Sequence, residues 1–364
     1  MEHLLIRADA TSRIGTGHMM RCLALAQAWQ THGGGVSFLS HCDNDALRRR
    51  VRDAGMSFIS IGNPYPDDGD LPTTLSTLSQ LTSMDHDAPP WLVLDGYHFD
   101  PVYHHGIRAA GFRLLVMDDC AHLPRYHADA LLNQNVYAED LRYQCDQDTI
   151  LLLGTRYVLL RPEFLTWRGW KRDIPDAARK VLVTLGGSDP DNVTLKVIEG
   201  LQQVGVKSLE VKVIVGPANA HHESLRRAAE KVSYDLQLLS DVMDMPALMA
   251  WSDVAISACG TTSWELAFMG LPSIALVLAD NQELAARVLN ERRVVLSLGN
   301  GASLQVESIR AAVLQLLTDR ATRQAMSEGG QLLVDGRGAE RVVTKLSHKD
   351  FADAFLMPWG DSDA

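Results

Sequence analysis

Short apolar runs alternate with helical patterns along most of the chain. The run LLIRA at residues 4–8 is followed by a helical pattern over 17–31, and VSFLS at 36–40 is followed by another over 45–55. The alternation continues through WLVLDGY and RLLVMDD in the first half, and through KVLVTLGG, VAISAC and SIALVL in the second. Strand-length apolar runs that alternate with helices are typical of a parallel sheet covered on both faces.

One segment interrupts this rhythm. Residues 166–180, TWRGWKRDIPDAARK, are polar, basic and contain proline, which indicates an interdomain linker. The pattern therefore predicts two doubly wound α/β domains, over residues 1–165 and 181–346, with a long helical region at 304–346 and a tail at 347–364. Ligands of such folds bind beyond the carboxyl ends of the strands, so we expect the functional site in a cleft between the two halves.

Composition narrows the class of protein. The chain has 364 residues, a formal net charge of −11 and five cysteines without a C-x-x-C pair. The acidic balance argues against nucleic acid as a partner, and the scattered cysteines favour reduced thiols over a disulfide framework. The sequence shows no secretion signal and no apolar run long enough to span a bilayer, so we expect a cytoplasmic protein without stable membrane insertion.

The loop after the first expected strand carries the first candidate for chemistry. In DATSRIGTGHMMR, Gly15 and Gly17 allow the backbone to turn tightly, and His18 falls near the start of the helix. The spacing is not that of a dinucleotide-binding G-x-G-x-x-G loop. A histidine here is either a general base or a donor to a phosphate, or it is a surface histidine in an ordinary turn.

Two strand-to-helix loops of the second half contain glycine and hydroxyl residues. TLGGSDPDN includes Gly187 and Ser188, and SACGTTSWELAFMG includes a run of small residues followed by Glu265. Backbone N–H groups and hydroxyls suit a diphosphate, and a carboxylate suits a ribose diol; helix capping alone is the alternative for both loops. The small residues of the second loop are Gly260, Thr261, Thr262 and Ser263.

Further polar residues follow other expected strands. Asp95, Tyr97 and His98 follow one strand, and Asp118 and Asp119 follow the next. These residues either position a hydroxyl or water, or cap the next segment. The amides of Asn281 and Gln282, in ADNQE, suit sugar hydroxyl or acetamido groups. The adjacent pairs His104–His105 and His221–His222 diverge on a helix, so we expect no metal site there.

Taken in order, these loops resemble a known family. RADATSRIGTGHMMRCLALAQAW, LVLDGY, MDD, TLGGSDPDN, ACGTTSWELAFMGLPSIALVLADNQ and VVLSLG resemble the UDP-sugar hydrolases of pseudaminic acid biosynthesis and their spore-coat polysaccharide relatives. This family belongs to the GT-B superfamily and is similar to the N-acetylglucosaminyl transferase of peptidoglycan synthesis. The resemblance covers about residues 3 to 320, and Gly-x-Gly-His-x-x-Arg is its most specific part.

The resemblance implies a reaction and a set of residues. Water attacks the anomeric carbon of a UDP-activated 2,4-diacetamido-2,4,6-trideoxy hexose, configuration inverts, and UDP leaves, without a metal or other cofactor. His18 matches the proposed base. The matching substrate positions are Arg13, Gly15, Gly17, Tyr97, Asn281 and Gln282, and the matching UDP positions are Gly187, Ser188, Gly260, Thr261, Thr262, Ser263 and Glu265.

Two other functions remain open at this point. A glycosyltransferase on the same scaffold, acting in surface polysaccharide or flagellin glycan synthesis, needs an acceptor pocket in the first half. A binding or scaffold protein of polysaccharide assembly shows UDP affinity without turnover. The residues alone do not choose the sugar, and the additions near 62–90 and at the C-terminus have no assigned role.

Overall fold

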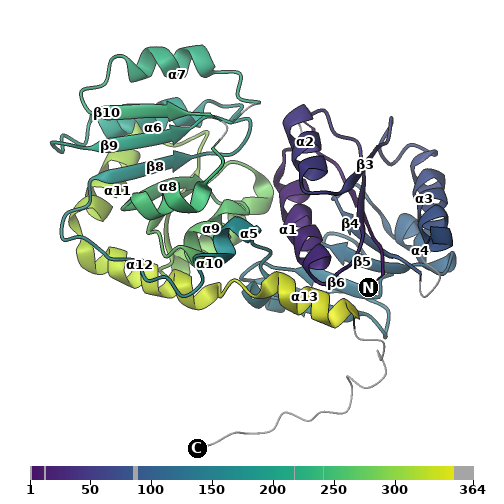
Figure 1. Cartoon of the computed structure of the whole chain (residues 1–364). Helices are drawn as coiled ribbons and strands as arrows, with labels where there is room; N and C mark the ends of the chain where they lie inside the picture. Colours follow the sequence, from purple (N-terminus) through teal and green to yellow (C-terminus); the bar gives the residue numbers. More distant parts are fainter. Residues whose placement is uncertain (1, 12–13, 85–88, 217, 241, 348–364) are drawn as a thin grey trace, which may run out of the picture.

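The chain forms two parallel sheets, each covered by helices on both faces (Figure 1). The computed structural model describes residues 2–11, 14–84, 89–216, 218–240 and 242–347. The first sheet has the strand order β3-β2-β1-β4-β5-β6-β7, and the second has the order β10-β9-β8-β11-β12-β13. The expectation of two doubly wound, Rossmann-like halves is therefore confirmed.

The strands of the first sheet are β1 (Leu4–Ala8), β2 (Val36–Ser40), β3 (Ser57–Ser60), β4 (Trp91–Asp95), β5 (Arg113–Met117), β6 (Ala130–Asn133) and β7 (Ile150–Leu153). Those of the second are β8 (Lys180–Thr184), β9 (Glu210–Ile214), β10 (Asp235–Leu239), β11 (Val254–Ala258), β12 (Ser273–Val277) and β13 (Val295–Asn300). Most of the central strands are buried along their whole length, as expected where helices cover both faces.

Helices connect the strands. In the first half they are α1 (Gly17–Thr31), α2 (Asp45–Asp53), α3 (Asp70–Met84), α4 (Pro101–Ala109) and α5 (Pro162–Leu165). In the second they are α6 (Val193–Gln202), α7 (His222–Ala229), α8 (Met245–Trp251), α9 (Thr262–Phe268), α10 (Glu283–Glu291), α11 (Val306–Thr318), α12 (Arg320–Leu333) and α13 (Gly338–Ser347). Among the described residues no helix is long and apolar enough to cross a bilayer.

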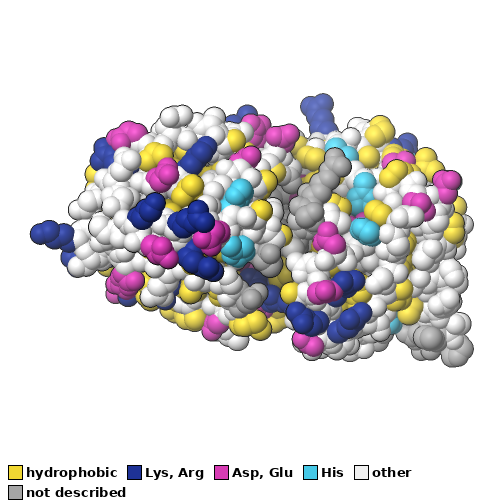
Figure 2. All heavy atoms as spheres, turned by 90° about the horizontal axis from the view of Figure 1, so that it is seen from above, with side chains coloured by type: hydrophobic (Ala, Val, Ile, Leu, Met, Phe, Trp, Pro, Cys, Tyr) yellow, Lys and Arg dark blue, Asp and Glu magenta, His cyan; other side chains and the backbone are white. Residues whose placement is uncertain are grey.

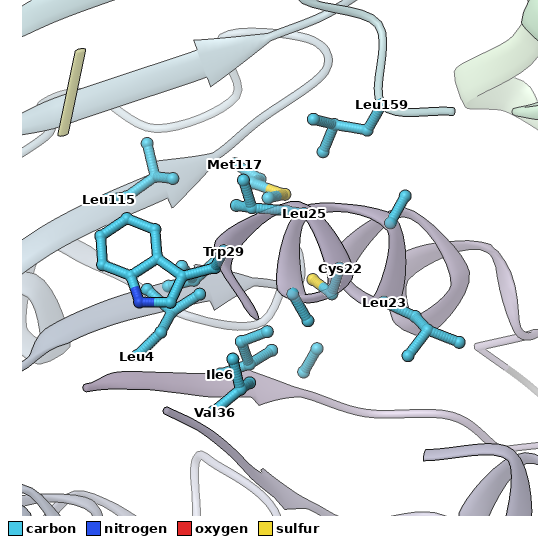
Figure 3. Packing of buried hydrophobic residues seen from close by; sticks show 14 of the residues in the cluster. Leu4, Ile6, Cys22, Leu23, Leu25, Trp29, Val36, Leu115, Met117 and Leu159 are labelled. Carbon is cyan, nitrogen blue, oxygen red and sulfur yellow. The ribbon is translucent and has the colours of Figure 1, made fainter. Parts of the chain in front are cut away.

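Helix α1 is fixed by an apolar face that packs on the first sheet (Figure 3). Its buried side chains include Cys22, Leu25 and Trp29, which pack with Leu4 and Ile6 of β1 in one cluster. Trp29 also donates a hydrogen bond from Nε1 to the Glu2 carbonyl at 2.9 Å. Burial of this face from Met19 to Trp29 fixes the rotation of the helix and therefore the direction of the residues in its first turn.

The last described helix returns to the first half of the chain. α13 packs against α1, and Val342, Val343 and Leu346 belong to the same core cluster as β1. A Cβ on Gly338 would lie 2.1 Å from the Val158 carbonyl oxygen, so only glycine fits this crossing. Residues 338–346 fall inside the range expected for the second domain but pack with the first. The expected tail at 347–364 lies almost wholly outside the described residues.

The hydrophobic pattern predicts the helices and strands less completely in three places. β7 has no counterpart among the strands expected from the sequence, because it is a short edge strand between polar loops. The helical region 304–346 is three helices, and Asp319 caps the second of them by accepting from Thr322 N at 3.0 Å. The short helix α5 ends at Leu165, directly before the expected linker.

The linker is anchored to the second half by Arg172. Its Nε donates to the Met269 carbonyl at 3.1 Å, and its two terminal nitrogens donate to the carbonyls of Met249 and Ser252. These carbonyls lie at the C-terminal ends of α8 and α9, and the Met249 carbonyl also accepts from Ser252 N at 3.3 Å. Burial lowers the Arg172 pKa to about 10, so the side chain remains charged at neutral pH.

Replacing Arg172 with methionine is expected to destabilise the protein by about 3 kcal/mol, because three buried carbonyls lose a charged donor. Urea unfolding measured by circular dichroism checks this. Lys171→Met is the matched control, since Lys171 is exposed. Equal unfolding midpoints for the two variants would contradict the role given to Arg172.

Candidate active site

The loop between β1 and α1 places His18 at the carboxyl edge of the first sheet. Gly15 has φ +80° and donates its N–H to the Thr11 carbonyl at 2.8 Å, which closes a tight turn. Thr16 precedes the helix, and its carbonyl accepts from Met20 N at 3.0 Å. His18 is therefore the second residue of α1, and its partly exposed side chain lies beyond the end of the strands.

His18 forms a dyad with Asp95, the last residue of β4. Asp95 Oδ1 accepts from His18 Nδ1 at 2.6 Å, and the Asp95 side chain is fully buried. Burial opposes the charge on Asp95, but the charge of Arg21 and hydrogen bonds from Arg21 and His18 hold the pKa of that carboxyl well below its usual range. An ionised Asp95 requires a proton on Nδ1, which leaves the lone pair of His18 on Nε2.

Arg21 joins the carboxylates of two neighbouring strands. Its Nε and one terminal nitrogen donate to Asp95, both at 2.7 Å, and its other terminal nitrogen donates to both oxygens of Asp119 at 2.8 and 2.9 Å. Asp119 also accepts from Asn135 Nδ2 at 2.7 Å. Each oxygen of these two buried carboxylates thus has a donor, which a buried charge requires.

Tyr97 connects this network to the second half of the chain. Its hydroxyl donates to Asp119 Oδ2 at 2.6 Å and accepts from Asn281 Nδ2 at 3.1 Å. Its ring meets the His18 ring edge to face, with centroids 5.2 Å apart. Burial and the charge of Asp119 raise the Tyr97 pKa, so the hydroxyl keeps its proton. The structure therefore brings together His18, Tyr97 and Asn281, three of the predicted site residues.

The two loops of the second half with small residues approach the loop that carries His18. A Cβ on Gly187 would lie 3.9 Å from Thr16 Oγ1, and a Cβ on Gly17 would lie 3.9 Å from Thr261 Oγ1. Thr262 begins α9, and Gly260 precedes it. The predicted UDP residues Gly187, Gly260, Thr261 and Thr262 thus lie across the cleft from the start of α1.

Other predicted residues have partners within the protein. The Ser263 hydroxyl is buried and lies 3.7 Å from Cys259 Sγ, and Gln282 Oε1 accepts from Leu278 N at 3.0 Å. Glu265 Oε1 accepts from Arg161 Nε at 3.0 Å. Burial raises the Glu265 pKa, and the charge of Arg161 opposes that rise. Arg13 lies outside the described residues.

A cavity of about 430 Å³ lies between the halves on the β2 side of the His18 loop. Gly15 and Thr16 contribute to its wall, together with residues 43–45 before and at the start of α2. Gly187, Ser188 and Ala218 form its wall in the second half. Seen from above, acidic and basic side chains are mixed over both lobes (Figure 2).

One group of potential metal ligands occurs among the described residues. Ligand atoms of Asp118, Cys120 and His122 lie within 4.8 Å of one another. The Asp118 carboxylate already accepts hydrogen bonds from His122 Nδ1, from two backbone N–H groups and from the hydroxyls of Tyr126 and Tyr143. The hydrogen bond to Asp118, followed by that to Cys120, raises the His122 pKa to about 10, which favours a cation there over a metal ligand.

The residues that sequence reasoning missed lie under the site. No role was assigned to Arg21, Asn135 or Arg161, although all three hold predicted site residues through their partners. Arg21 could have been predicted, because it lies one helical turn after His18 and therefore on the same face of α1. Asn135 and Arg161 could not, because their partners are distant in the sequence.

Comparisons with known proteins add the following. Residues 181–341 match the glycosyltransferase family 28 C-terminal domain. The spore coat polysaccharide biosynthesis protein SpsG of Bacillus subtilis is 30% identical over 225 residues, which are 60% of this chain and 65% of SpsG. A UDP-2,4-diacetamido-2,4,6-trideoxy-β-L-altropyranose hydrolase of Campylobacter jejuni is 23% identical over 297 residues, 79% of this chain and 96% of the hydrolase.

Structural similarity covers both halves at once. The crystal structure of MurG from Acinetobacter baumannii superimposes with a TM-score of 0.66 and 14% identity, over 95% of this chain and 99% of MurG. The chain spans less than two thirds of the length of SpsG but nearly all of the hydrolase and of MurG. The chain therefore combines the GT-B fold with a second half that matches the glycosyltransferase family 28 C-terminal domain.

Proposed function

We propose that the chain is a glycosyltransferase that moves a sugar from UDP to a hydroxyl acceptor, with His18 as the general base. The observation that carries this proposal is the His18–Asp95 dyad, which faces the glycosyltransferase-like half across the cleft. An imidazole whose Nδ1–H is bound by a buried carboxylate has its other nitrogen free to accept a proton.

The proposed reaction is a single displacement. His18 Nε2 takes the proton of the acceptor hydroxyl while its oxygen attacks the anomeric carbon. The bond from that carbon to the UDP oxygen breaks, UDP leaves with the electron pair, and configuration inverts. The proton on His18 then passes to solvent. Asp95 stabilises the imidazolium formed in this step and holds the ring in place.

The second half supplies the proposed nucleotide site. The negative charge that develops on UDP is met by backbone N–H groups and hydroxyls of the loops that include Ser188, Thr261 and Thr262. Glu265 is proposed to bind the ribose through the carboxylate oxygen that Arg161 leaves free. Asn281 and Tyr97 meet at the side of the cleft next to His18, which suits contacts to the sugar.

Hydrolysis is the second candidate, because the hydrolase from Campylobacter jejuni is similar over 96% of its length. The same base would activate water, and the substrate would be a UDP-activated 2,4-diacetamido-2,4,6-trideoxy hexose of pseudaminic acid biosynthesis. The match to a glycosyltransferase domain supports transfer more directly than 23% identity supports hydrolysis. The expectation of a hydrolase drawn from the sequence therefore takes second place.

Replacement of His18 with glutamine is expected to lower kcat by on the order of 10²- to 10⁴-fold, because the proton has no acceptor. UDP affinity, measured by calorimetry, stays unchanged. His32→Gln is the matched control, an exposed histidine at the other end of α1. Full activity of the His18 variant would exclude His18 as the base.

The rate of UDP release from a UDP-sugar separates transfer from hydrolysis. UDP-2,4-diacetamido-2,4,6-trideoxy-β-L-altropyranose and UDP-N-acetylglucosamine are tested without any acceptor. A transferase is expected to release UDP slowly from either donor until a hydroxyl acceptor is added. Rapid release from the first donor in water alone, lost in the His18 variant, would establish the hydrolase instead.

Asp95→Asn is expected to lower the free energy of unfolding at pH 7 by about 3–5 kcal/mol, because Arg21 loses a buried partner. The Asp95 pKa is depressed in the folded protein, so its contribution is complete above the unfolded pKa of about 4 and declines as pH falls further. Denaturant titrations from pH 7 to 3 are expected to show the two proteins converging below pH about 4. Asp45→Asn, at a carboxylate 79% exposed, is the control; a constant difference across this range would refute the linkage.

A further inference from the structure

A cluster of three reactive side chains beside the candidate active site takes no part in the proposed reaction. Asp118 is the first residue after β5, and its ligand atom lies within 4.8 Å of those of Cys120 and His122. Asp119, which anchors Arg21, lies between Asp118 and Cys120 in the chain. The cluster combines a carboxylate, an imidazole and a thiol, which are the groups found around reactive cysteines.

The turn that carries Cys120 is fixed by its backbone. Asp118 Oδ1 accepts from Cys120 N at 2.9 Å and from Ala121 N at 2.6 Å. Ala121 has φ +52°, a left-handed conformation that is uncommon for a residue with a Cβ, and His122 lies back against Asp118 directly after it. The Cys120 side chain is exposed at this turn. The thiol is therefore held beside His122 and is open to solvent.

His122 carries a proton on both ring nitrogens. Nδ1 lies 2.7 Å from Asp118 Oδ2, and Nε2 lies 3.2 Å from the Tyr97 carbonyl oxygen. A carbonyl oxygen and an ionised carboxylate can only accept. Burial opposes ionisation of Asp118, but hydrogen bonds from His122 and from the Ala121 N–H keep the pKa of that carboxyl below its usual value. Both ring nitrogens must therefore donate, and the imidazole is a cation.

A cation beside a thiol favours the thiolate, which is the form that attacks electrophiles. The two carboxylates nearby do not cancel this effect, because each has a cation of its own. Asp118 is hydrogen-bonded to His122, and Asp119 is paired with Arg21. Without His122, the charge of Asp118 would face the sulfur unbalanced and disfavour the thiolate.

The four other cysteines lie in different surroundings. Cys22, Cys42 and Cys259 are buried, and Cys145 is half-buried. Burial raises the pKa of all four thiols, that of Cys145 and that of Cys259 to about 11. All five cysteines of the chain lie among the described residues, so Cys120 is the one exposed thiol.

Tyr97 lies between this cluster and the proposed base. Its ring meets the His122 ring edge to face with centroids 5.5 Å apart, and it meets the His18 ring in the same way at 5.2 Å. His122 donates to the Tyr97 carbonyl, and the Tyr97 hydroxyl accepts from Asn281. A group attached to the sulfur of Cys120 would lie against His122 and thereby disturb Tyr97, on the side of the cleft proposed for the sugar.

We propose that Cys120 is a modification site, where a small disulfide forms a mixed disulfide that weakens binding of the UDP-sugar. The thiol proton goes to solvent, and the thiolate sulfur attacks one sulfur of the disulfide. A bond forms between these two sulfurs, the bond between the two reagent sulfurs breaks, and the second sulfur leaves with the electron pair and takes a proton from solvent. Cys120 is oxidised, the reagent is reduced, and an added thiol reverses the reaction. The effect on the UDP-sugar rests on the proposed function, whereas the reaction of the thiol does not.

The first test uses dithiodipyridine, an uncharged disulfide whose product thiopyridone is measured by its absorbance. In the folded full chain, one thiol is expected to react on the order of tenfold or more faster than any other, and mass spectrometry of the peptides is expected to place it at Cys120. Cys120→Ser is expected to remove this fast phase. A fast phase at another cysteine, or the lack of any fast phase, would overturn the proposal.

The second test removes the cation. His122→Gln is expected to slow the reaction of Cys120 on the order of tenfold, because the sulfur then faces the charge of Asp118 alone. His222→Gln is the matched control, since His222 is an exposed histidine of α7 in the second half, and its rate stays unchanged. Equal rates in the two variants would overturn the role given to His122.

The third test measures the effect on the candidate active site by calorimetry. The modified protein is expected to bind UDP as before and UDP-N-acetylglucosamine or UDP-2,4-diacetamido-2,4,6-trideoxy-β-L-altropyranose on the order of tenfold more weakly, and dithiothreitol restores the affinity. Cys120→Ser treated in the same way is the control and shows no change. Unchanged UDP-sugar affinity of the modified protein would overturn the effect on the site. Failure of the unmodified protein to bind either UDP-sugar would instead defeat the proposed function, and the labelling of Cys120 would still be measured.

Discussion

The candidate active site depends on Arg21. The carboxylates of Asp95 and Asp119 lie at the ends of adjacent parallel strands, and neither would stay ionised in that buried place alone. The planar guanidinium meets both, with two nitrogens that donate to Asp95 and one that donates to both oxygens of Asp119. The other polar residues attach to these two anions: His18 to Asp95, and Tyr97 and Asn135 to Asp119. Loss of this one cation would therefore disturb the orientation of every group proposed to act on the sugar.

The two halves share an apolar cluster that includes Tyr137, Phe164 and Trp264, and their loops meet in specific contacts above it. Small residues at Gly17 and Gly187 let loops of one half approach hydroxyls of the other, and Asn281 reaches Tyr97. Because α13 packs in the core of the first half, the last described helix lies against β1 and α1 near the start of the chain. The cavity between the two halves lies on the β2 side of the His18 loop.

The sequence predicted the repeating strands and helices well, because buried parallel strands are apolar along their whole length. The helix at 17–31 and the strand at 91–95 lie where the pattern places them. The pattern was weaker for β7, a short edge strand, and for α13, whose apolar face gives no sign of which core it joins. Periodicity reports that a face is buried, and the partner of that face is a long-range property.

The sequence alone specifies which residue types stand at the strand ends: a histidine after β1, acids at the ends of β4 and β5, and small hydroxyl residues at the start of α9. The partners of these residues follow only from the tertiary structure. Asp95 is 77 residues from His18, Asp119 is 98 residues from Arg21, and Arg161 is 104 residues from Glu265. It also turned the Ser263 hydroxyl toward Cys259 and left the cavity on the β2 side open. Local sequence patterns specify the side chains that each loop contains. Ion pairs and cavities arise from the order of the strands in the sheets, which no single loop encodes.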